Sequence, residues 1–468
     1  MSRGIRTAAV AAVLGVGASL GFAQPIAYAD RPPAVDPGQA PSGDPAKPSE
    51  PTERKANAPC TSTVAGGEGP TVPTAQAALD LPHAWQFSKG EGQVVAVIDT
   101  GVARHPRLPG LRAGGDFVAN SGDGTEDCDA HGTLVAGIIG ASQVPGQGFS
   151  GVAPASTVLA IRQTSDKYVK AGSNATKSPE DLSKEGYGNV ATMAQAIRRA
   201  ADMGATVINI SEVACSSSPI SDGSLGAALH YAVHTKNAVV VTSAGNTDND
   251  NCKGNTNILD PLDPAADPWS KTTVNVTPAR YDDLALSVGS INADGAPSEF
   301  TVPGPWLSVA APGENIVSLD AVGTGVINGT VGGQGQQSIN GTSFAAPYVS
   351  GVVALVRSRF PELSAVDVMK RIQATAHAPA EGWNPYVGYG AIDPVAALTN
   401  EVTDELRPKQ PNPPMNKQLA IPAPPDPPDH TARNVALIGS GIIGGSLIIG
   451  YLASFPTRRR FGVGEDDA

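Results

Sequence analysis

Residues 93–102 read QVVAVIDTGV, and this stretch decides the fold class. The run from Gln93 to Ile98 is nearly continuous in apolar residues, which is typical of a strand buried on both faces. Such strands occur in parallel sheets that helices cover on each side. Asp99 comes directly after the run. The stretch therefore predicts a buried parallel strand with a carboxylate at its carboxyl end.

Helices and strands alternate in the following part of the chain. The pattern predicts helices over about residues 190–203 and 224–235. Each is followed by an apolar run that predicts a strand, over 206–210 and 238–242. This alternation predicts an α/β fold with a parallel sheet and helices on both faces. Ligands bind at the carboxyl ends of strands in such sheets, so functional residues are expected there.

Three further segments place polar residues at a strand end or a helix start, as Asp99 is placed. The segment HGTLVAG begins at His131, where the pattern predicts the start of a helix. The segment SAGN follows the strand over 238–242 and ends at Asn246. The segment GTSFAAP places Ser343 at the start of another helix. Strand ends and helix starts are the positions at which such a sheet can bring these four residues together.

The four residue types together suit nucleophilic catalysis. The hydroxyl of Ser343 is a weak nucleophile until a base takes its proton, and His131 is a base suited to neutral pH. A histidine in this role needs a carboxylate, here Asp99, to hold its tautomer and stabilise the imidazolium that forms. The amide of Asn246 can donate a hydrogen bond to the oxyanion, together with the backbone N–H of Ser343 at its helix start.

The segments VVAVIDTGV, HGTLVAG, SAGN and GTSFAAP resemble the four signature regions of the subtilisin-like serine proteases, the subtilases. Their order along the chain, Asp then His then Ser, is also that of subtilisin. The resemblance spans roughly residues 80–400 and implies a subtilisin-like fold for a serine endopeptidase. It implies Asp99, His131 and Ser343 as the catalytic triad and Asn246 as the oxyanion donor.

One segment departs from the family's pattern. Subtilases usually have Ser-Leu-Gly after the strand over 206–210, where the backbone pairs with substrate, whereas this chain has Ser-Glu-Val. A valine in place of glycine narrows the backbone freedom, and we expect the glutamate charge near the rim of the first specificity pocket. We therefore expect a small or unusually shaped pocket and poor activity on generic substrates. The resemblance implies substrate-binding walls formed by Ser211, Glu212, Val213, Ser243, Ala244 and Gly245.

The beginning of the 468-residue chain reads as an export signal. Basic residues, an apolar run and an Ala-Tyr-Ala site predict a secretory signal peptide over residues 1–29, with a retained membrane anchor as the alternative. The formal net charge of −12 argues against nucleic-acid binding as the main function.

An uncharged apolar segment over residues 434–455 lies near the other end. Its length suffices to cross a hydrocarbon core of about 30 Å, so it predicts a transmembrane helix, with a buried soluble helix as the alternative. Three arginines, 458–460, follow it, and the positive-inside rule then places the tail, residues 456–468, in the cytoplasm. We expect a single-pass plasma-membrane protein whose catalytic domain is extracytoplasmic, on the periplasmic side.

Two Pro-rich stretches, a 30–79 extension and a 401–433 linker, flank the expected catalytic domain over residues 80–400. The parts richest in proline, 30–59 and 404–430, lack an apolar period, so we expect them to be extended and solvated. The extension is too short for a folded core of its own. We expect it to wrap the catalytic domain instead of forming a separate inhibitory module.

Four cysteines in an exported chain predict two disulfides, for which three connectivities are possible. Cys215 and Cys252 follow strands that one helix links and that are expected to be neighbours, so we pair them. Cys60 then pairs with Cys128, which would tie the extension to the loop before the histidine.

The signal peptide, extension, cysteines, linker and C-terminal apolar segment together resemble the mycosins, the membrane-anchored subtilases of mycobacterial type VII secretion systems. This resemblance points to the same cysteine pairing, to a protein or peptide substrate, and to type VII membrane components as partners. No cofactor, metal or nucleic acid is expected. The alternative function is a structural subunit of the secretion complex in which proteolysis is secondary.

Overall fold

The structure of the chain is a computed structural model that describes residues 31–172, 181–182, 186–255, 258–259, 266–332, 335–402 and 430–460, with side chains up to Phe455. The expected signal peptide and most of the second Pro-rich stretch lie outside the described residues. The chain forms two units, Met1–Pro413 and Pro414–Ala468, which are described one at a time.

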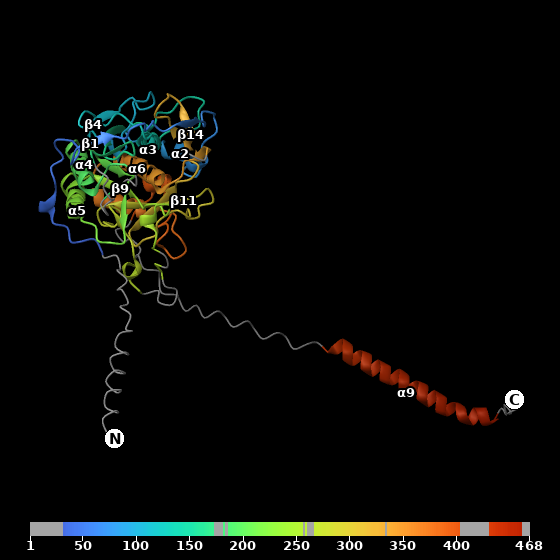
Figure 1. Cartoon of the computed structure of the whole chain (residues 1–468). Coiled ribbons are helices and arrows are strands. Elements are labelled where there is room, and N and C mark those ends of the chain that lie inside the picture. Colours follow the sequence, from blue (N-terminus) through green and yellow to red (C-terminus); the bar gives the residue numbers. More distant parts are fainter. Residues whose placement is uncertain are drawn as a thin grey trace, which may run out of the picture. The chain divides into compact units, whose positions relative to one another are not determined.

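Seven parallel strands form the main sheet of the first unit (Figure 1). In chain order they are β3 (Val94–Asp99), β4 (Arg112–Asp116), β5 (Thr157–Arg162), β7 (Val207–Ile210), β9 (Val239–Ser243), β11 (Leu286–Ile291) and β12 (Leu307–Pro312). Their spatial order is β12-β11-β9-β7-β3-β5-β4. Strands β5 and β4 lie on one side of β3, whereas β7, β9, β11 and β12 lie on the other, so the strand order reverses direction at β3, the switch point of the sheet. A reversal of this kind opens a crevice at the carboxyl ends of the strands. Asp99 ends β3 at this crevice.

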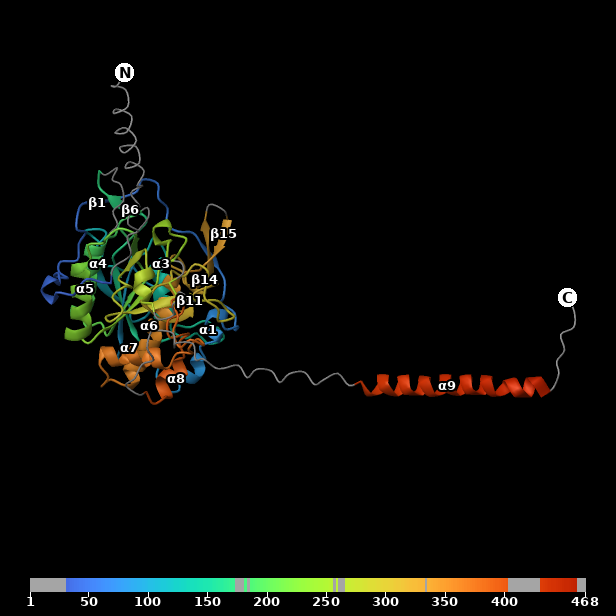
Figure 2. The ribbon, with the colours of Figure 1, turned by 90° about the horizontal axis from the view of Figure 1, so that it is seen from below.

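Helices cover both faces of the sheet. Successive side chains of a strand point to opposite faces, and Val95, Ala96, Val97 and Ile98 are all 0% exposed, so both faces of β3 are buried. Helices α3 (His131–Gly140) and α6 (Thr342–Arg359) pack against each other and contact β3, while α4 (Val190–Asp202) and α5 (Gly223–His230) form a second packed pair (Figures 1 and 2). The predicted α/β architecture is confirmed.

The remaining elements are short and lie around this core. The helices are α1 (Thr74–Ala77), α2 (Leu81–Ala84), α7 (Ala365–Ala374) and α8 (Pro394–Thr399), with single turns η1 (Pro37–Gln39), η2 (Tyr231–Thr235), η3 (Asp250–Cys252) and η4 (Pro268–Lys271). The strands are β1 (Thr52–Arg54), β2 (Thr63–Ala65), β6 (Tyr168–Lys170), β8 (Ala214–Ser216), β10 (Asn275–Thr277), β13 (Ser318–Leu319), β14 (Val326–Gly332) and β15 (Gly335–Ser338).

The bounds of the helices follow local signals in the sequence. Asn189 caps α4, since its side chain accepts a hydrogen bond from the Thr192 N–H at 2.9 Å. The helix ends shortly before Gly204, which has a φ of +81° that glycine adopts without strain. The helix expected over 224–235 is α5, but its last turn, η2, is π-helical.

The N-terminal extension wraps the first unit, as expected (blue in Figure 1). Residues 31–59 are mostly exposed, as expected, but the extension also makes ordered contacts with the domain. Strand β1 pairs antiparallel with β6, and β2 pairs antiparallel with β14. Between β1 and η1, the Ser49 N–H donates a hydrogen bond to the Tyr187 hydroxyl at 3.0 Å. Backbone pairing to the domain replaces the core that the extension cannot build for itself.

Two disulfides join segments that are distant in the sequence. Cys215 bonds to Cys252, with their Cα atoms 5.0 Å apart, and this links β8, which follows β7, to η3, which follows β9. Cys60 bonds to Cys128, with their Cα atoms 4.5 Å apart. The Thr61 N–H also donates to the Cys128 carbonyl at 2.9 Å, so the extension is fixed beside the loop that leads into α3. Both pairs are those that the sequence indicated.

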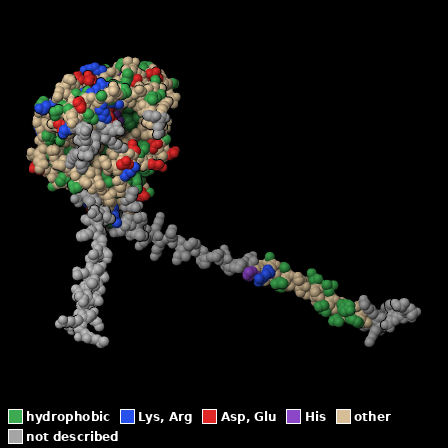
Figure 3. All heavy atoms as spheres, in the orientation of Figure 1, with side chains coloured by type: hydrophobic (Ala, Val, Ile, Leu, Met, Phe, Trp, Pro, Cys, Tyr) green, Lys and Arg blue, Asp and Glu red, His purple; other side chains and the backbone are tan. Residues whose placement is uncertain are grey.

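The second unit contains one long helix, α9 (Thr431–Arg460). Its stretch Thr431–Phe455 has a mean hydropathy of 1.9 and is long enough to cross a membrane. Apolar side chains are exposed along this helix, and Figure 3 shows them with basic side chains at its first turn. Large apolar side chains are rarely exposed in such numbers in water, so the helix has the character of a membrane span.

Candidate active site

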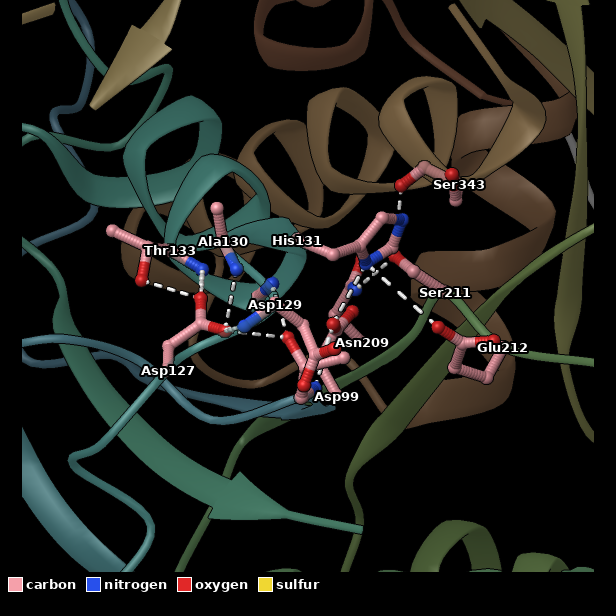
Figure 4. A network of polar contacts seen from close by, with 12 residues as sticks. Asp99, Asp127, Asp129, Ala130, His131, Thr133, Asn209, Ser211, Glu212 and Ser343 are labelled. Carbon is pink, nitrogen blue, oxygen red and sulfur yellow. Dashed lines mark hydrogen bonds and ion pairs between the residues drawn. The ribbon is translucent and has the colours of Figure 1, made fainter. Parts of the chain in front are cut away.

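Asp99 and His131 form a hydrogen-bonded pair at the switch point of the sheet (Figure 4). Their Oδ1 and Nδ1 atoms are 2.7 Å apart, and the Asp99 side chain is 0% exposed. The Thr100 N–H also donates to Oδ1, at 2.7 Å, which fixes the carboxylate. Because Nδ1 donates to Asp99, the other ring nitrogen is left as the acceptor. Figure 4 shows the ring between Asp99 and Ser343.

The position of His131 depends on the start of α3, which Asp127 caps. Its carboxylate accepts hydrogen bonds from the N–H groups of Ala130 and Thr133, each at 2.8 Å. Burial raises the pKa of Asp127 to about 7 against the opposing effect of these hydrogen bonds. Ala130 has a φ of +68°, an uncommon conformation that turns the chain into the helix. The sequence reasoning missed Asp127, for which an aspartate shortly before the predicted helix start was the available signal.

Ser343 lies in the first turn of α6 and is 8% exposed. The N–H groups of a first turn have no acceptor within their own helix, so the Ser343 N–H is available to a ligand. The preceding Gly341 has a φ of +156°. A Cβ at Gly341 would lie 3.0 Å from Ser343 Oγ and 3.3 Å from Asn246 Nδ2. Only glycine therefore leaves the space between the hydroxyl and this amide open.

The side chain of Asn246 is oriented by Thr342. Its Oδ1 accepts hydrogen bonds from the Thr342 N–H at 3.0 Å and from the Thr342 hydroxyl at 2.8 Å. Two donors on Oδ1 fix which end of the amide is the oxygen, and Nδ2 then faces the space beside Ser343 Oγ. The side-chain N–H of Asn246 and the backbone N–H of Ser343 can thus converge on one oxygen atom.

A series of buried side-chain hydrogen bonds ends on the backbone carbonyl of Ser343. The Ser211 hydroxyl donates to the Ser343 carbonyl at 2.8 Å, and Asn209 Nδ2 donates to the Ser211 hydroxyl at 2.9 Å. The Ser350 hydroxyl in turn donates to Asn209 Oδ1 at 2.8 Å. Asn209 and Ser350 were not singled out in the sequence, because their importance comes from contacts between β7 and α6.

A cleft of about 600 Å³ brings most of the expected site residues together. Those that line it are His131, Ser211, Glu212, Val213, Ser243, Gly245, Asn246 and Ser343. Ala244 does not line it, since this residue is 0% exposed and packs in the core beside the Cys215–Cys252 disulfide. Thr61, Thr330 and Ser338 also line the cleft. The extension, strand β14 that pairs with it, and strand β15 beside β14 therefore build part of one wall.

Glu212, which lines the cleft, also lies beside the histidine. Its Oε1 is 3.8 Å from His131 Nδ1, and its side chain is 23% exposed (Figure 4). The position follows from the sheet, because β7 and β3 are parallel neighbours and their carboxyl ends adjoin. The charge of Glu212 therefore acts on the same ring nitrogen as that of Asp99.

The charges around His131 change its proton affinity. Burial lowers the pKa of His131, but the Asp99 charge and hydrogen bond, with the charges of Glu212 and Asp127, outweigh this and raise the pKa above its usual range. Burial raises the pKa of Glu212, the His131 charge lowers it, and the Asp99 charge raises it further. The arrangement favours the protonated forms of both groups.

Among the described residues, one group of side chains, Asp99, His131 and Glu212, has the composition of a metal site, with donor atoms within 4.8 Å of one another. The 2.7 Å hydrogen bond from His131 Nδ1 to Asp99 already occupies the nitrogen that a metal would need. The geometry is that of a histidine held by a carboxylate.

Comparison with known proteins identifies the family of this chain. The Subtilase family (Peptidase_S8) matches residues 90–390, so the chain belongs to the subtilase family and is a serine endopeptidase. The chain is also 44% identical to Mycosin-4 of Mycobacterium tuberculosis over 463 residues, which cover 97% of this chain and 96% of Mycosin-4.

Two solved structures extend this similarity to three dimensions. The crystal structure of MycP1 from Mycobacterium smegmatis is 43% identical with a TM-score of 0.75, and the match covers 82% of this chain and 98% of that chain. A chain in the structure of an intact ESX-5 inner membrane complex is 41% identical with a TM-score of 0.75, covering 92% of this chain and 100% of that chain.

Proposed function

We propose that Asp99, His131 and Ser343 are the catalytic triad of this endopeptidase and that Asn246 is its oxyanion donor. The observation that carries the proposal is the 2.7 Å bond between His131 Nδ1 and Asp99 Oδ1 at a cleft that Ser343 also lines. The bond fixes the ring so that its other nitrogen can act as a base. The open space between Ser343 Oγ and Asn246 Nδ2 suits an oxyanion.

The proposed reaction begins when Ser343 Oγ attacks the carbonyl carbon of the scissile peptide. His131 takes the hydroxyl proton, and the Asp99 carboxylate stabilises the resulting imidazolium. The developing oxyanion accepts hydrogen bonds from Asn246 Nδ2 and the Ser343 N–H. His131 then protonates the leaving amine, which leaves an acyl-enzyme on Ser343. Water, activated by the same histidine, hydrolyses this ester and restores the serine.

A fluorophosphonate probe tests the assembled triad directly, because it reacts with a serine that a neighbouring base activates. We expect the full chain in detergent to be labelled and Ser343→Ala to show no labelling. Loss of the hydroxyl leaves the rest of the cleft in place, so the melting temperature should change little. Labelling of Ser343→Ala at the wild-type rate would refute the assignment of the nucleophile.

We further propose that the protein is a single-pass plasma-membrane protein that works in a type VII secretion system. The mycosin likeness over nearly the whole chain supports this system, and the apolar stretch Thr431–Phe455 supports the membrane span. Arginines 458–460 after the apolar stretch favour a cytoplasmic tail and an extracytoplasmic catalytic domain. The substrate would then be an exported protein or peptide, cut after it leaves the cytoplasm.

A second, structural role is supported by the likeness to a chain of the intact ESX-5 inner membrane complex. In that role the protein would stabilise the secretion complex, and its contacts would matter independently of Ser343. Complementing a deletion strain with the Ser343→Ala variant separates the two roles. Restored secretion with an uncut substrate would indicate both roles, whereas failure to restore secretion would make proteolysis the essential one.

The walls of the proposed substrate cleft predict a preference for a small side chain on the acyl side of the scissile bond. Val213 stands close to the opposite wall, since a Cβ at Gly245 would lie 3.3 Å from Val213 Cγ2 and 3.6 Å from Cys215 Sγ. A valine and a disulfide thus occupy the space in which a large substrate side chain would have to fit.

Replacing Val213 with glycine is expected to widen this pocket. The ratio of kcat/KM for a leucine-containing peptide to that for its alanine counterpart should rise by about tenfold or more, since each accommodated methylene is worth roughly 1–3 kcal/mol. Internally quenched peptides that differ only at this position provide the measurement. An unchanged ratio in a folded variant would show that other residues close the pocket.

A further inference from the structure

We propose that Glu212 is a positioning residue for the catalytic histidine: a second carboxylate at Nδ1 that sets the pH above which the enzyme works. The inference rests on the proposed role of His131 as the base. It concerns a residue that the triad does not require, and it predicts how the chemistry of this site depends on pH.

The geometry gives the two carboxylates different roles at the same nitrogen. Nδ1 carries one proton, and Asp99 Oδ1 at 2.7 Å accepts it in a hydrogen bond. Glu212 Oε1 at 3.8 Å is beyond hydrogen-bonding distance but is close enough for its charge to act on the ring. The His131 and Glu212 side chains are 24% and 23% exposed, so water screens the pair only in part.

The surroundings of the histidine are strongly acidic. The groups that act on it or on Glu212 are Asp99 at the end of β3, Asp127 and Asp129 before α3, and Asp166 after β5. The ring of Phe344 on α6, which bears no charge, packs against the imidazole with centroids 4.9 Å apart. Among the described residues that line the cleft, the other cationic side chain is that of Lys167. Since carboxylates outnumber cations around the ring, the protonated form of His131 is stabilised.

Glu212 can itself titrate near neutral pH, a property that it shares with Asp127, but the Glu212 carboxylate lies only 3.8 Å from His131 Nδ1. Burial and the charges of Asp99, Asp166 and Asp129 raise its pKa, while the His131 charge lowers it. As the pH rises, ionisation of Glu212 places a second negative charge beside the ring and delays the loss of the His131 proton. The two side chains therefore titrate as a linked pair.

Ionised Glu212 shifts the pH dependence of catalysis in one direction. Protonated His131 cannot accept the proton of Ser343, so the free enzyme is inactive until the ring loses its proton. A negative Glu212 raises the pH at which this happens and moves the acid limb of the activity profile upward. The same charge stabilises the imidazolium formed in the transition state, so it does not lower activity at high pH.

The test compares Glu212→Gln with wild type, using the full chain in detergent and the rate of fluorophosphonate labelling from pH 5 to 10. The midpoint of the acid limb should fall by about one pH unit or more in the variant. At a pH below the wild-type midpoint, the variant should therefore be labelled about tenfold faster than wild type. Labelling at the highest pH should be no faster than in wild type. Glutamine keeps the size of the side chain, so a purely structural role would not move the midpoint.

Glu362→Gln is the matched control. It removes the same charge from an exposed residue just beyond the far end of α6, whose 18 residues span about 27 Å from Ser343. The control should leave the midpoint at the wild-type value. An equal midpoint in Glu212→Gln and wild type, or equal shifts in the two variants, would overturn the inference.

A second readout keeps the inference testable if labelling is weak. The proton on His131 can be followed by NMR in protein with ¹³C-labelled histidine, with its signal assigned by its absence in His131→Gln. The apparent pKa of His131 should be lower in Glu212→Gln by about one unit or more. If wild type fails to label at any pH, the proposed function fails, yet the NMR titration still decides the role of Glu212. Glu212→Leu, which removes the charge with an apolar group, replaces the glutamine variant if that one does not fold.

Discussion

Replacing His131 with alanine is expected to lower kcat by about 10⁶, as loss of the serine or the histidine does in subtilisin. Without the imidazole, no group held by Asp99 remains to take the Ser343 proton or to protonate the leaving amine. The measurement is kcat for an internally quenched peptide at saturating concentration, with single-turnover assays for the slow variant. Fluorophosphonate labelling should disappear in parallel.

The fold should tolerate this change. The His131 side chain is 24% exposed, and Asp127 caps α3 through the N–H groups of Ala130 and Thr133, which the substitution leaves in place. A melting temperature within a few degrees of wild type would confirm that the loss is chemical. A decrease in kcat of less than about 10² would contradict the proposal, because another group would then serve as the base.

Replacing Asn246 with alanine is expected to lower kcat by about 10²–10³ with little change in KM. Its Nδ2 group faces the space beside Ser343 Oγ, where we propose that the oxyanion forms. The charge of an oxyanion exists in the transition state but not in bound substrate. Asn246→Asp should be at least as damaging, since it loses the donor and places a negative charge beside the oxyanion. Steady-state kinetics on one peptide substrate measures both variants.

The control for Asn246 is Thr342→Ser, which keeps the hydroxyl that donates to Asn246 Oδ1 at 2.8 Å. Because the amide would stay oriented, this variant should retain activity within a few-fold of wild type. Asn246→Ala with kcat unchanged and only KM raised would mean that the amide binds substrate without stabilising the transition state.

Much of the fold was predictable because its signals are local. The buried strand before Asp99 and the helices before β7 and β9 are encoded by apolar runs and periods of a few residues. The cysteine pair after β7 and β9 followed from the rule that strands linked by one helix are neighbours. The extension was harder to predict, since its strands form only by pairing with β6 and β14, more than 100 residues away in the sequence.

The candidate site likewise contains residues that local sequence signals reveal and residues that only the fold reveals. Asp99, His131, Asn246 and Ser343 could be found because each stands in a short segment whose residue types carry a chemical meaning. Asn209 and Ser350 could not, since each is an ordinary polar residue until folding places it in the chain of hydrogen bonds that reaches the serine. Asp127 had one local signal, its position shortly before the predicted helix start, which the sequence reasoning missed. The buried Ala244 was assigned to the cleft because its neighbours line it, and a sequence does not show which residue of a wall faces inward.

The sequence by itself determined which residues we propose for the chemistry of this protein: a nucleophile, a base, its carboxylate and an oxyanion donor, each at the end of a strand or the start of a helix. The tertiary structure decided how that chemistry is tuned. It placed Glu212 within 3.8 Å of the histidine nitrogen, and Val213 against Gly245. The physical reason is that residue type and local period fix what a side chain can do, whereas its pKa and its neighbours depend on charges and atoms that only folding brings within a few ångströms.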